Sequence, residues 1–156
     1  MDTKEIVYSV TPAGEKFALP QAHEYKPELD RIEQLVKEAR EKGQEIVVVM
    51  GVGFVGAVMA AIVADSKDKN GKNNKFVIGC QRPSVRSFWK IPILNRGVSP
   101  VKAEDPEVEE LIDRCVLQSK TLTATFNSDC LQFADCVVVD VQCDYFSFID
   151  IKGSTD

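Results

Sequence analysis

Residues 45–65, EIVVVMGVGFVGAVMAAIVAD, carry the strongest fold signal in this chain. The run 45–50 is apolar and rich in β-branched residues, which is typical of a strand buried on both faces of a parallel sheet. Residues 57–64 are apolar nearly all round, as expected of a helix packed against a sheet. A second apolar run, KFVIGC at residues 75–80, predicts another strand. This order predicts a βαβ unit with a right-handed crossover.

A glycine motif, GVGFVG, joins the first strand to the helix. Gly51 permits a tight turn, Gly53 omits the side chain that would block a bound pyrophosphate, and Gly56 lets the helix approach the strand. Backbone N–H groups at the start of the helix then face the anion. This context favours a dinucleotide site over a turn that serves packing alone. The loop residues expected to bind the cofactor are Gly51, Val52, Gly53, Phe54, Val55 and Gly56.

The end of the second strand carries Gln81, where a dinucleotide-binding domain usually has Asp or Glu to hold the ribose hydroxyls. Glutamine can still form hydrogen bonds with the ribose, but it lacks the negative charge that repels a 2′-phosphate. Arg82 and Arg86 follow, and a nearby arginine can pair with such a phosphate. NAD is the expected cofactor, with NADP as the alternative. The other interpretation of the two arginines is that they are solvated residues at a strand end.

The remaining chain alternates between helical and strand patterns. A helix is predicted at 27–42, with Pro27 in its first turn and Gly43 at its C-terminal cap. Asp105 and Pro106 predict the start of another helix, extending to about residue 118. Other predicted elements are strands at 6–10, 121–125 and 136–141, the last of a buried parallel type, a solvated loop at 65–74, and a short helix from Ser128 through Phe133. This alternation predicts an α/β fold, a single Rossmann-type domain whose parallel sheet is flanked by helices.

Composition sets limits on the class of protein. The chain has 156 residues, 44% of them hydrophobic, which fits one globular domain. A net charge of −5 argues against a nucleic acid partner. The N-terminus does not resemble a signal peptide, and no run approaches the ~18 apolar residues of a membrane span. We therefore expect a cytoplasmic protein without a membrane partner, and whether it forms a homo-oligomer is left open.

Cysteine and histidine usage points away from metal sites. The five cysteines include no CxxC pair, and their odd number argues against a disulfide framework, so we expect reduced, mostly buried thiols. His23 is the only histidine, which disfavours a multi-histidine metal site or a catalytic triad. We predict neither a metal ligand nor a catalytic residue in this chain.

These motifs together resemble the N-terminal NAD-binding domain of the UDP-glucose/GDP-mannose dehydrogenase family. The similarity covers about residues 46–145, and it includes LNRGVSP at 94–100 and TLTATFNSDCLQFADCVVVDV at 121–141. The LNRGVSP segment makes it more specific than a general Rossmann pattern. The resemblance implies an oxidoreductase of polysaccharide biosynthesis. Such an enzyme oxidises the C6 alcohol of a UDP- or GDP-sugar to the uronic acid by two hydride transfers to NAD.

The resemblance also assigns roles to single residues. Val55, Gln81 and Arg86 fall where family members contact the adenosine half of the cofactor. The turn after the last strand, which reads TPT-like in the family and lies under the nicotinamide, is here Val141-Gln142-Cys143. Cys143 stands at the position of the second threonine, and a small buried residue at a strand end is the alternative interpretation.

The family's catalytic cysteine lies in a GGxCxPKD loop, where it forms a thiohemiacetal and then a thioester. This loop does not occur in the sequence. Each of Cys80, Cys115, Cys130, Cys136 and Cys143 is therefore better explained by packing than by nucleophilic catalysis. We expect the chain to bind the cofactor, and to reach a nucleotide sugar only together with further domains.

We expect the chain to be a truncated part of a longer protein. Residues 1–43 form an N-terminal extension, whose 27–42 helix is expected to pack on the sheet edge or on a partner domain. Residues 44–145 form the dinucleotide-binding domain, and 146–156 a truncated C-terminal tail. Two alternatives stay open: the cofactor domain of another Rossmann oxidoreductase, and a non-catalytic dinucleotide-sensing module.

Overall fold

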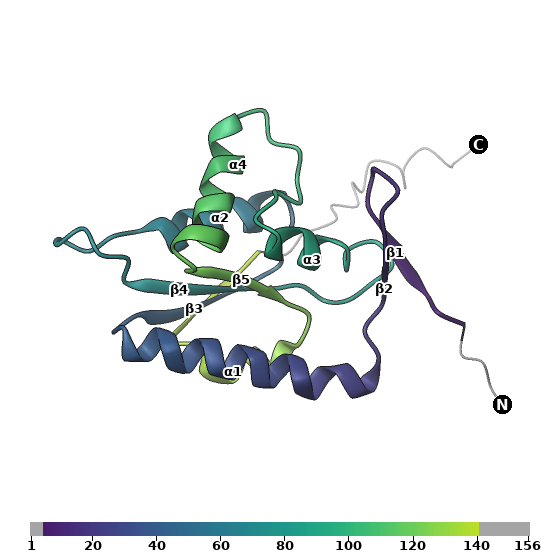
Figure 1. Ribbon diagram of the computed structural model, residues 1–156, viewed down its shortest axis with the longest axis horizontal. Coiled ribbons are helices and arrows are strands. Elements are labelled where there is room, and N and C mark those ends of the chain that lie inside the picture. Colours follow the sequence, from purple (N-terminus) through teal and green to yellow (C-terminus); the bar gives the residue numbers. More distant parts are fainter. Residues whose placement is uncertain (1–4, 141–156) are drawn as a thin grey trace, which may run out of the picture.

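A four-stranded parallel sheet forms the centre of the computed structural model, which describes residues 5–140 (Figure 1). The strands stand in the order β5-β4-β3-β6, and every neighbouring pair is parallel. Their bounds are β3 (Glu45–Met50), β4 (Lys75–Cys80), β5 (Leu122–Thr125) and β6 (Cys136–Val139). The predicted α/β class, with a parallel sheet flanked by helices, is confirmed.

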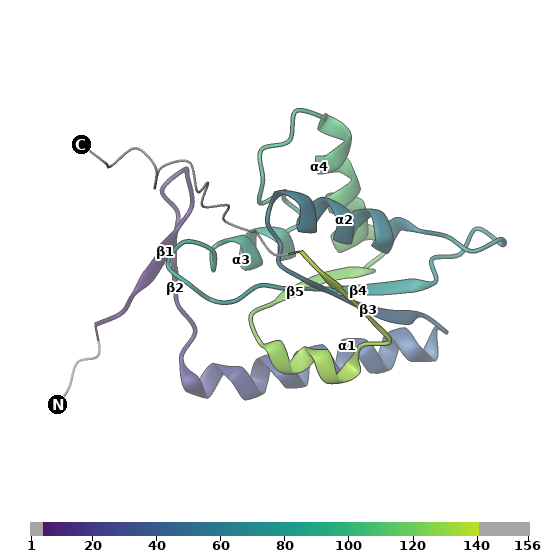
Figure 2. The same cartoon turned by 180° about the vertical axis from the view of Figure 1, so that it is seen from behind.

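Helices cover both faces of the sheet, as Figures 1 and 2 show. One face carries α2 (Phe54–Asp65), α3 (Lys90–Asn95) and α4 (Pro106–Asp113), with a π-helical turn at Arg114–Gln118. The other face carries α1 (Tyr25–Glu41) and the 3-10 helix Ser128–Phe133. The chain between β3 and β4 passes over the first face through α2, so the predicted βαβ unit is confirmed.

The sheet separates two apolar cores. Because successive side chains of a strand point to opposite faces, β3 contributes Val47 and Val49 to the α2 side. It contributes Ile46 and Val48 to the α1 side. All four side chains are buried, which explains why the sequence of this strand is continuously apolar.

Helix α1 is an integral layer of this domain. It ends at Glu41, and Gly43 follows the cap residue Lys42 with a φ of +74°, the left-handed conformation that glycine adopts readily. Its buried stripe, Ile32, Val36 and Ala39, packs in one cluster with the β3 and β4 side chains of that face. The expectation that this helix packs on the sheet edge or on a partner domain is therefore wrong. A moderately apolar stripe does not distinguish a sheet face from a sheet edge, and here the 3-10 helix Ser128–Phe133 shares the cover of this face with α1.

An antiparallel hairpin precedes α1. It consists of β1 (Tyr8–Val10) and β2 (Lys16–Ala18), and is followed by a 3-10 turn at Ala22–Glu24. The strand predicted at 6–10 is confirmed in part, whereas β2 was not predicted because three residues give too short a pattern. The Ser9 hydroxyl donates to the Val85 carbonyl at 2.8 Å and accepts from the Trp89 N–H at 3.1 Å. The hairpin is thereby joined to the chain that follows β4.

Two short helices differ in detail from expectation. The side chain of Asp105 caps α4 by accepting from the Glu107 N–H, as predicted. The α-helix ends at Asp113, and the chain continues to residue 118 as a π-helical turn. The helix expected from Ser128 is a 3-10 helix whose cap is Asn127, because the Asn127 side chain accepts from the Asp129 N–H at 3.0 Å.

Strand β6 is parallel to β3, as predicted, but it is not buried. Within the described residues β3 is its only neighbour, and the side chains of Val137 and Val139 are 45% and 64% exposed. An edge position accounts for this difference, since an apolar sequence does not reveal whether a further layer covers it. Among residues 5–140, no helix combines the length and apolar character needed to cross a membrane.

Candidate functional site

A pocket of about 690 Å³ lies where the carboxyl ends of β3, β4 and β6 meet. Met50, Cys80 and Asp140 bring the three strand ends to its wall, and the glycine loop and the start of α2 complete that side. Crevices outside the carboxyl ends of parallel strands are the usual ligand sites of open α/β sheets.

Gly51 and Gly56 hold the loop in a close contact that has no room for side chains. Gly51 has a φ of +96°, and its N–H donates to the Cys80 carbonyl at 2.7 Å. A Cβ atom on Gly51 would strike the Asp140 carbonyl oxygen. One on Gly56 would strike the Gly51 carbonyl oxygen and lie 2.9 Å from Asp140 Oδ2. The predicted roles of these two glycines, a tight turn and close approach of the helix to the strand, match this geometry.

Gly53 differs from its two neighbours, because a Cβ atom placed on it would have nothing within 4 Å. It is the N-cap residue of α2, lines the pocket, and has an extended conformation open to any residue. The first backbone N–H groups of a helix have no partner within the helix, so those of α2 begin at this open space. Phe54 and Val55, the next residues of the motif, also line the pocket and are 66% and 53% exposed.

Gln81 joins the end of β4 to the glycine loop. Its backbone N–H donates to the Thr125 carbonyl at 3.0 Å, and its side-chain Oε1 accepts from the Val52 N–H at 3.0 Å. The sequence predicted Gln81 as a cofactor-binding residue but did not predict its hydrogen bond with the Val52 N–H. Val52 and Gln81 are 29 residues apart, and they meet only because of the way β3 and β4 align. Val52 is fully buried in the core on the α2 side, so its side chain packs under the loop and does not face a ligand.

A basic segment that follows β4 forms another part of the pocket wall. Arg82 and Arg86, both predicted, line it together with Gln81. Lys90 and Ser87 line it too and were not predicted, although Lys90 follows Arg86 by four residues. Within residues 5–140, the charged groups of these two arginines and of Lys90 make no ion pair.

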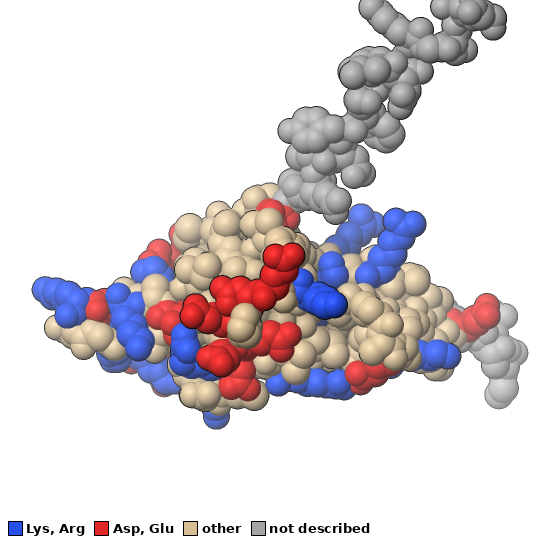
Figure 3. Space-filling model, turned by 90° about the horizontal axis from the view of Figure 1, so that it is seen from above, with Lys and Arg blue, Asp and Glu red and all other residues tan. Residues whose placement is uncertain are grey.

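Asp140 is the one carboxylate among the described residues that line the pocket. It was not predicted, but it directly follows the last apolar strand, and the rule that ligands gather at carboxyl ends would have found it. Other acidic residues gather elsewhere: Figure 3 shows a red group over the α4 side, apart from a group of basic side chains. The exposed acids around α4 are Glu104, Asp105, Glu107, Glu109 and Glu110.

Val141, Gln142 and Cys143, the turn expected under the nicotinamide, lie outside the described residues. Their part in cofactor binding stays a prediction.

The described cysteines are three buried thiols and the exposed Cys136. Cys80 lines the pocket, yet it is only 2% exposed, and a hydrogen bond with the Cys130 thiol lowers the pKa of Cys80. That bond and burial raise the pKa of Cys130. Burial raises the pKa of Cys115 to about 11, so this thiol stays protonated at neutral pH. Among residues 5–140, no cluster of His, Cys, Asp and Glu has the arrangement of a metal site.

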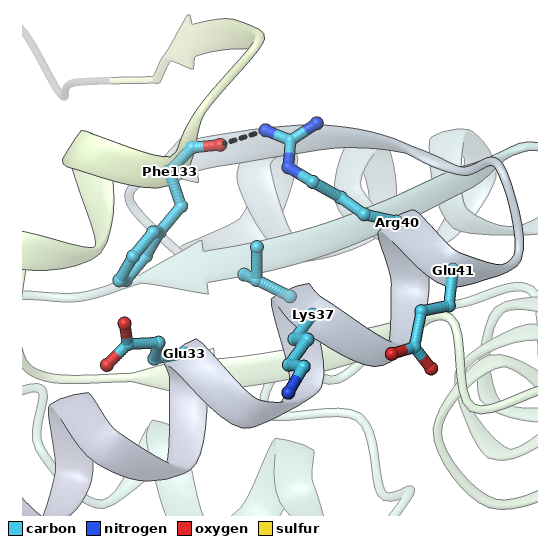
Figure 4. Close-up of a pocket in the computed structure, with 6 residues that line it drawn as sticks. Glu33, Lys37, Arg40, Glu41 and Phe133 are labelled. Atoms are coloured by element: carbon cyan, nitrogen blue, oxygen red, sulfur yellow. Dashed lines mark hydrogen bonds between the residues drawn. The ribbon is translucent and has the colours of Figure 1, made fainter.

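A second hollow, of about 550 Å³, lies between α1 and the end of the 3-10 helix that carries Phe133 (Figure 4). It is lined by side chains of both charges, including Glu33 and Lys37. Arg40 donates to the Phe133 carbonyl at 3.0 Å and pairs with Asp135 at 3.0 Å. These bonds fasten α1 to the chain that enters β6, and the hollow contains neither a strand end nor a glycine turn. We interpret it as part of the packing of α1.

Solved structures that are similar to this chain include two dehydrogenases. The NDP-N-acetyl-D-galactosaminuronic acid dehydrogenase of Methanosarcina mazei Go1 is 35% identical over 71% of this chain and 22% of its own, with a TM-score of 0.56. The UDP-glucose dehydrogenase of Pyrobaculum islandicum is 21% identical over 63% of this chain and 20% of its own, with a TM-score of 0.50. The chain thus spans about a fifth of the length of either protein. No family model and no curated protein matches the sequence.

Proposed function

Because this chain belongs with the nucleotide-sugar dehydrogenases of the UDP-glucose dehydrogenase family, we propose that it binds a nicotinamide dinucleotide, NAD(H) or NADP(H), as the cofactor domain of such an oxidoreductase. The similarity to the Methanosarcina mazei protein supports an oxidoreductase at the level of the family. The pocket supports the assignment of the cofactor to a particular part of the chain, the edge where the parallel strands end.

The observation that carries this proposal is the open space at Gly53. A strand, a glycine turn and the N-terminus of α2 surround a position that any larger side chain would fill. Backbone N–H groups and the positive end of the helix dipole suit a pyrophosphate there. Gln81 and the arginines that follow β4 would hold the adenosine ribose, and the nicotinamide, when bound, supplies the hydride acceptor.

We extend the proposal to the substrate only for the longer protein. In that protein the reaction would be oxidation of the C6 alcohol of a UDP- or GDP-sugar to the uronic acid, in two hydride transfers. The nucleophilic cysteine of the family's GGxCxPKD loop is not in this sequence. Among the described cysteines Cys80 alone lines the pocket, and it offers no accessible replacement because it is buried against Cys130. By itself the chain should bind the cofactor and leave a nucleotide sugar unoxidised.

Titration of the chain with NADH and with NADPH, followed by nicotinamide fluorescence, tests the proposal. We expect binding by the wild type and a loss of roughly tenfold or more in Gly53→Val, because the valine side chain occupies the pyrophosphate space. Ala22→Val is the matched control, since it adds the same kind of side chain at an exposed position of the 3-10 turn before α1. Failure of both cofactors to bind at millimolar concentration, or unchanged affinity in Gly53→Val, would refute the proposal.

A further inference from the structure

We infer that the pocket selects a dinucleotide carrying a 2′-phosphate, NADP(H), over NAD(H), and that Gln81, Arg82 and Arg86 determine this specificity. The inference rests on the proposed function, because it concerns the ribose end of the same pocket. Three observations carry it: the orientation of the Gln81 amide, the charge of the pocket wall, and the anchoring of the segment that carries the arginines.

The Gln81 side chain has a defined orientation. A backbone N–H can only donate, so the amide oxygen must face the Val52 N–H, with which it makes a 3.0 Å bond. The Nε2 group has no hydrogen-bond partner among residues 5–140, and it belongs to a residue that lines the pocket. Gln81 therefore offers two unused donors. A phosphate accepts such donors, whereas the carboxylate usual at this position accepts from the ribose hydroxyls and repels a phosphate.

The charge of the wall favours an anion with two negative charges. Arg82, Arg86 and Lys90 contribute three positive charges and Asp140 one negative charge, a balance of +2 for the described lining. Asp140 follows β6 and the arginines follow β4, and β3 stands between these two strands in the sheet. No carboxylate among the described residues neutralises the arginines, in a chain whose net charge is −5. Guanidinium groups pair with phosphate in a bidentate manner, which gives both energy and specificity.

The backbone of the basic segment is anchored at both arginines. The Ser87 hydroxyl donates to the Arg82 carbonyl at 2.9 Å, and the Trp89 indole N–H donates to the Arg86 carbonyl at 3.0 Å. Ser9 holds the intervening Val85 carbonyl. Binding of a phosphate would thus order the two exposed side chains but not the main chain, which lowers the entropic cost of binding.

Dissociation constants of NADPH and NADH, measured by isothermal titration calorimetry on the wild type, provide the first test. We expect NADPH to bind at least tenfold more tightly. Adenosine 2′,5′-bisphosphate and adenosine 5′-phosphate serve as probes without the nicotinamide, and the bisphosphate should bind the more tightly of the two. NADH binding as tight as NADPH binding, or tighter, would overturn the inference while leaving the proposed function intact. If neither dinucleotide binds, the proposed function and the inference fall together.

Two variants test the residues. Gln81→Glu keeps the shape of the side chain and an oxygen for the Val52 N–H, and it adds the negative charge, so it should reverse the preference toward NADH. Arg82→Gln combined with Arg86→Gln should weaken NADPH binding at least tenfold and NADH binding less than threefold. Lys37→Gln, which removes a cation from the outer side of α1, is the control and should change neither. An unchanged preference in Gln81→Glu, or equal losses for both cofactors in the arginine variant, would contradict the assignment.

Discussion

The contact between Gly56 and the glycine turn predicts a specific loss of stability in Gly56→Ala. The new Cβ would stand 2.9 Å from the Gly51 carbonyl carbon and closer still to its oxygen. Ordinary contact begins at about 3.5 Å, so relief of the contact with the carbon alone needs ~0.6 Å, and relief of the closer contact with the oxygen needs more than ~1 Å. Both atoms belong to the backbone, so they cannot give way by a side-chain rotation, whereas Asp140 Oδ2, which would lie 2.9 Å from the new Cβ, belongs to a side chain.

The magnitude follows from two opposing effects. Overpacking of a well-packed site costs about 1–3 kcal/mol, and the rigidity of the backbone places this contact in the upper part of that range. Alanine in a helix is favoured over glycine by about 1 kcal/mol, which offsets part of the cost. The net loss in the free energy of unfolding should be about 1–2 kcal/mol, which for a domain of this size lowers Tm by roughly 2–8 °C.

Urea and thermal unfolding followed by circular dichroism measure this loss. Gly53→Ala is the matched control, because the same substitution three residues earlier meets nothing within 4 Å. It should unfold within about 0.5 kcal/mol of the wild type, or gain up to ~1 kcal/mol from the reduced freedom of the unfolded chain. If Gly56→Ala were as stable as Gly53→Ala, the close approach of α2 to the end of β3 would be refuted.

Two further predictions concern the α1 side of the sheet. Ile32→Ala should lower the free energy of unfolding by about 2–4 kcal/mol, because Ile32 is fully buried against the sheet. Urea titrations measure this loss, and Lys37→Ala, at an exposed position of the same helix, is the control. A loss in Ile32→Ala no larger than that in the control would show that α1 is not part of the core. Arg40 and the Ile46 N–H hold the pKa of Asp135 below its ordinary value. A depressed carboxyl pKa stabilises the fold above the unfolded pKa of about 4, and this contribution is lost as pH falls through the folded pKa. The Tm of Asp135→Asn should therefore lie below that of the wild type at pH 7, and the difference in Tm should narrow as the pH is lowered below about 4. A difference in Tm that does not depend on pH would contradict the idea that the ionised Asp135 carboxylate stabilises the fold.

The sequence predicted the centre of the domain well. Strands β3 and β4 occupy the predicted bounds, 45–50 and 75–80, because burial on both faces forces a continuously apolar sequence that ends where the sheet ends. The glycine turn was equally clear. Gly51 and Gly56 stand where a side chain would collide with backbone, and such a requirement leaves a direct mark on the sequence.

Other features depend on partners that the sequence does not name. An apolar stripe predicted α1 but not the sheet face that it covers, and an apolar run predicted β6 but not its exposed edge position. Gln81 and the two arginines were found at a strand end, and Asp140 stands at the end of another strand, whereas Lys90 reaches the pocket only through the path of the chain in space. The bond from Val52 to Gln81 could not be predicted, since it depends on the alignment of β3 with β4.

The N-terminal hairpin supports the pocket at the strand ends. Ser9 is fully buried, and its hydroxyl holds the Val85 carbonyl, 76 residues further along the chain, while accepting the Trp89 N–H. Arg96 adds an ion pair to Glu15 of the same hairpin. The part of the pocket wall that carries Arg82 and Arg86 is therefore held in place by the hairpin, which lies outside the βαβ unit. A fragment limited to that unit would retain the glycine turn but lose this external support of its basic wall.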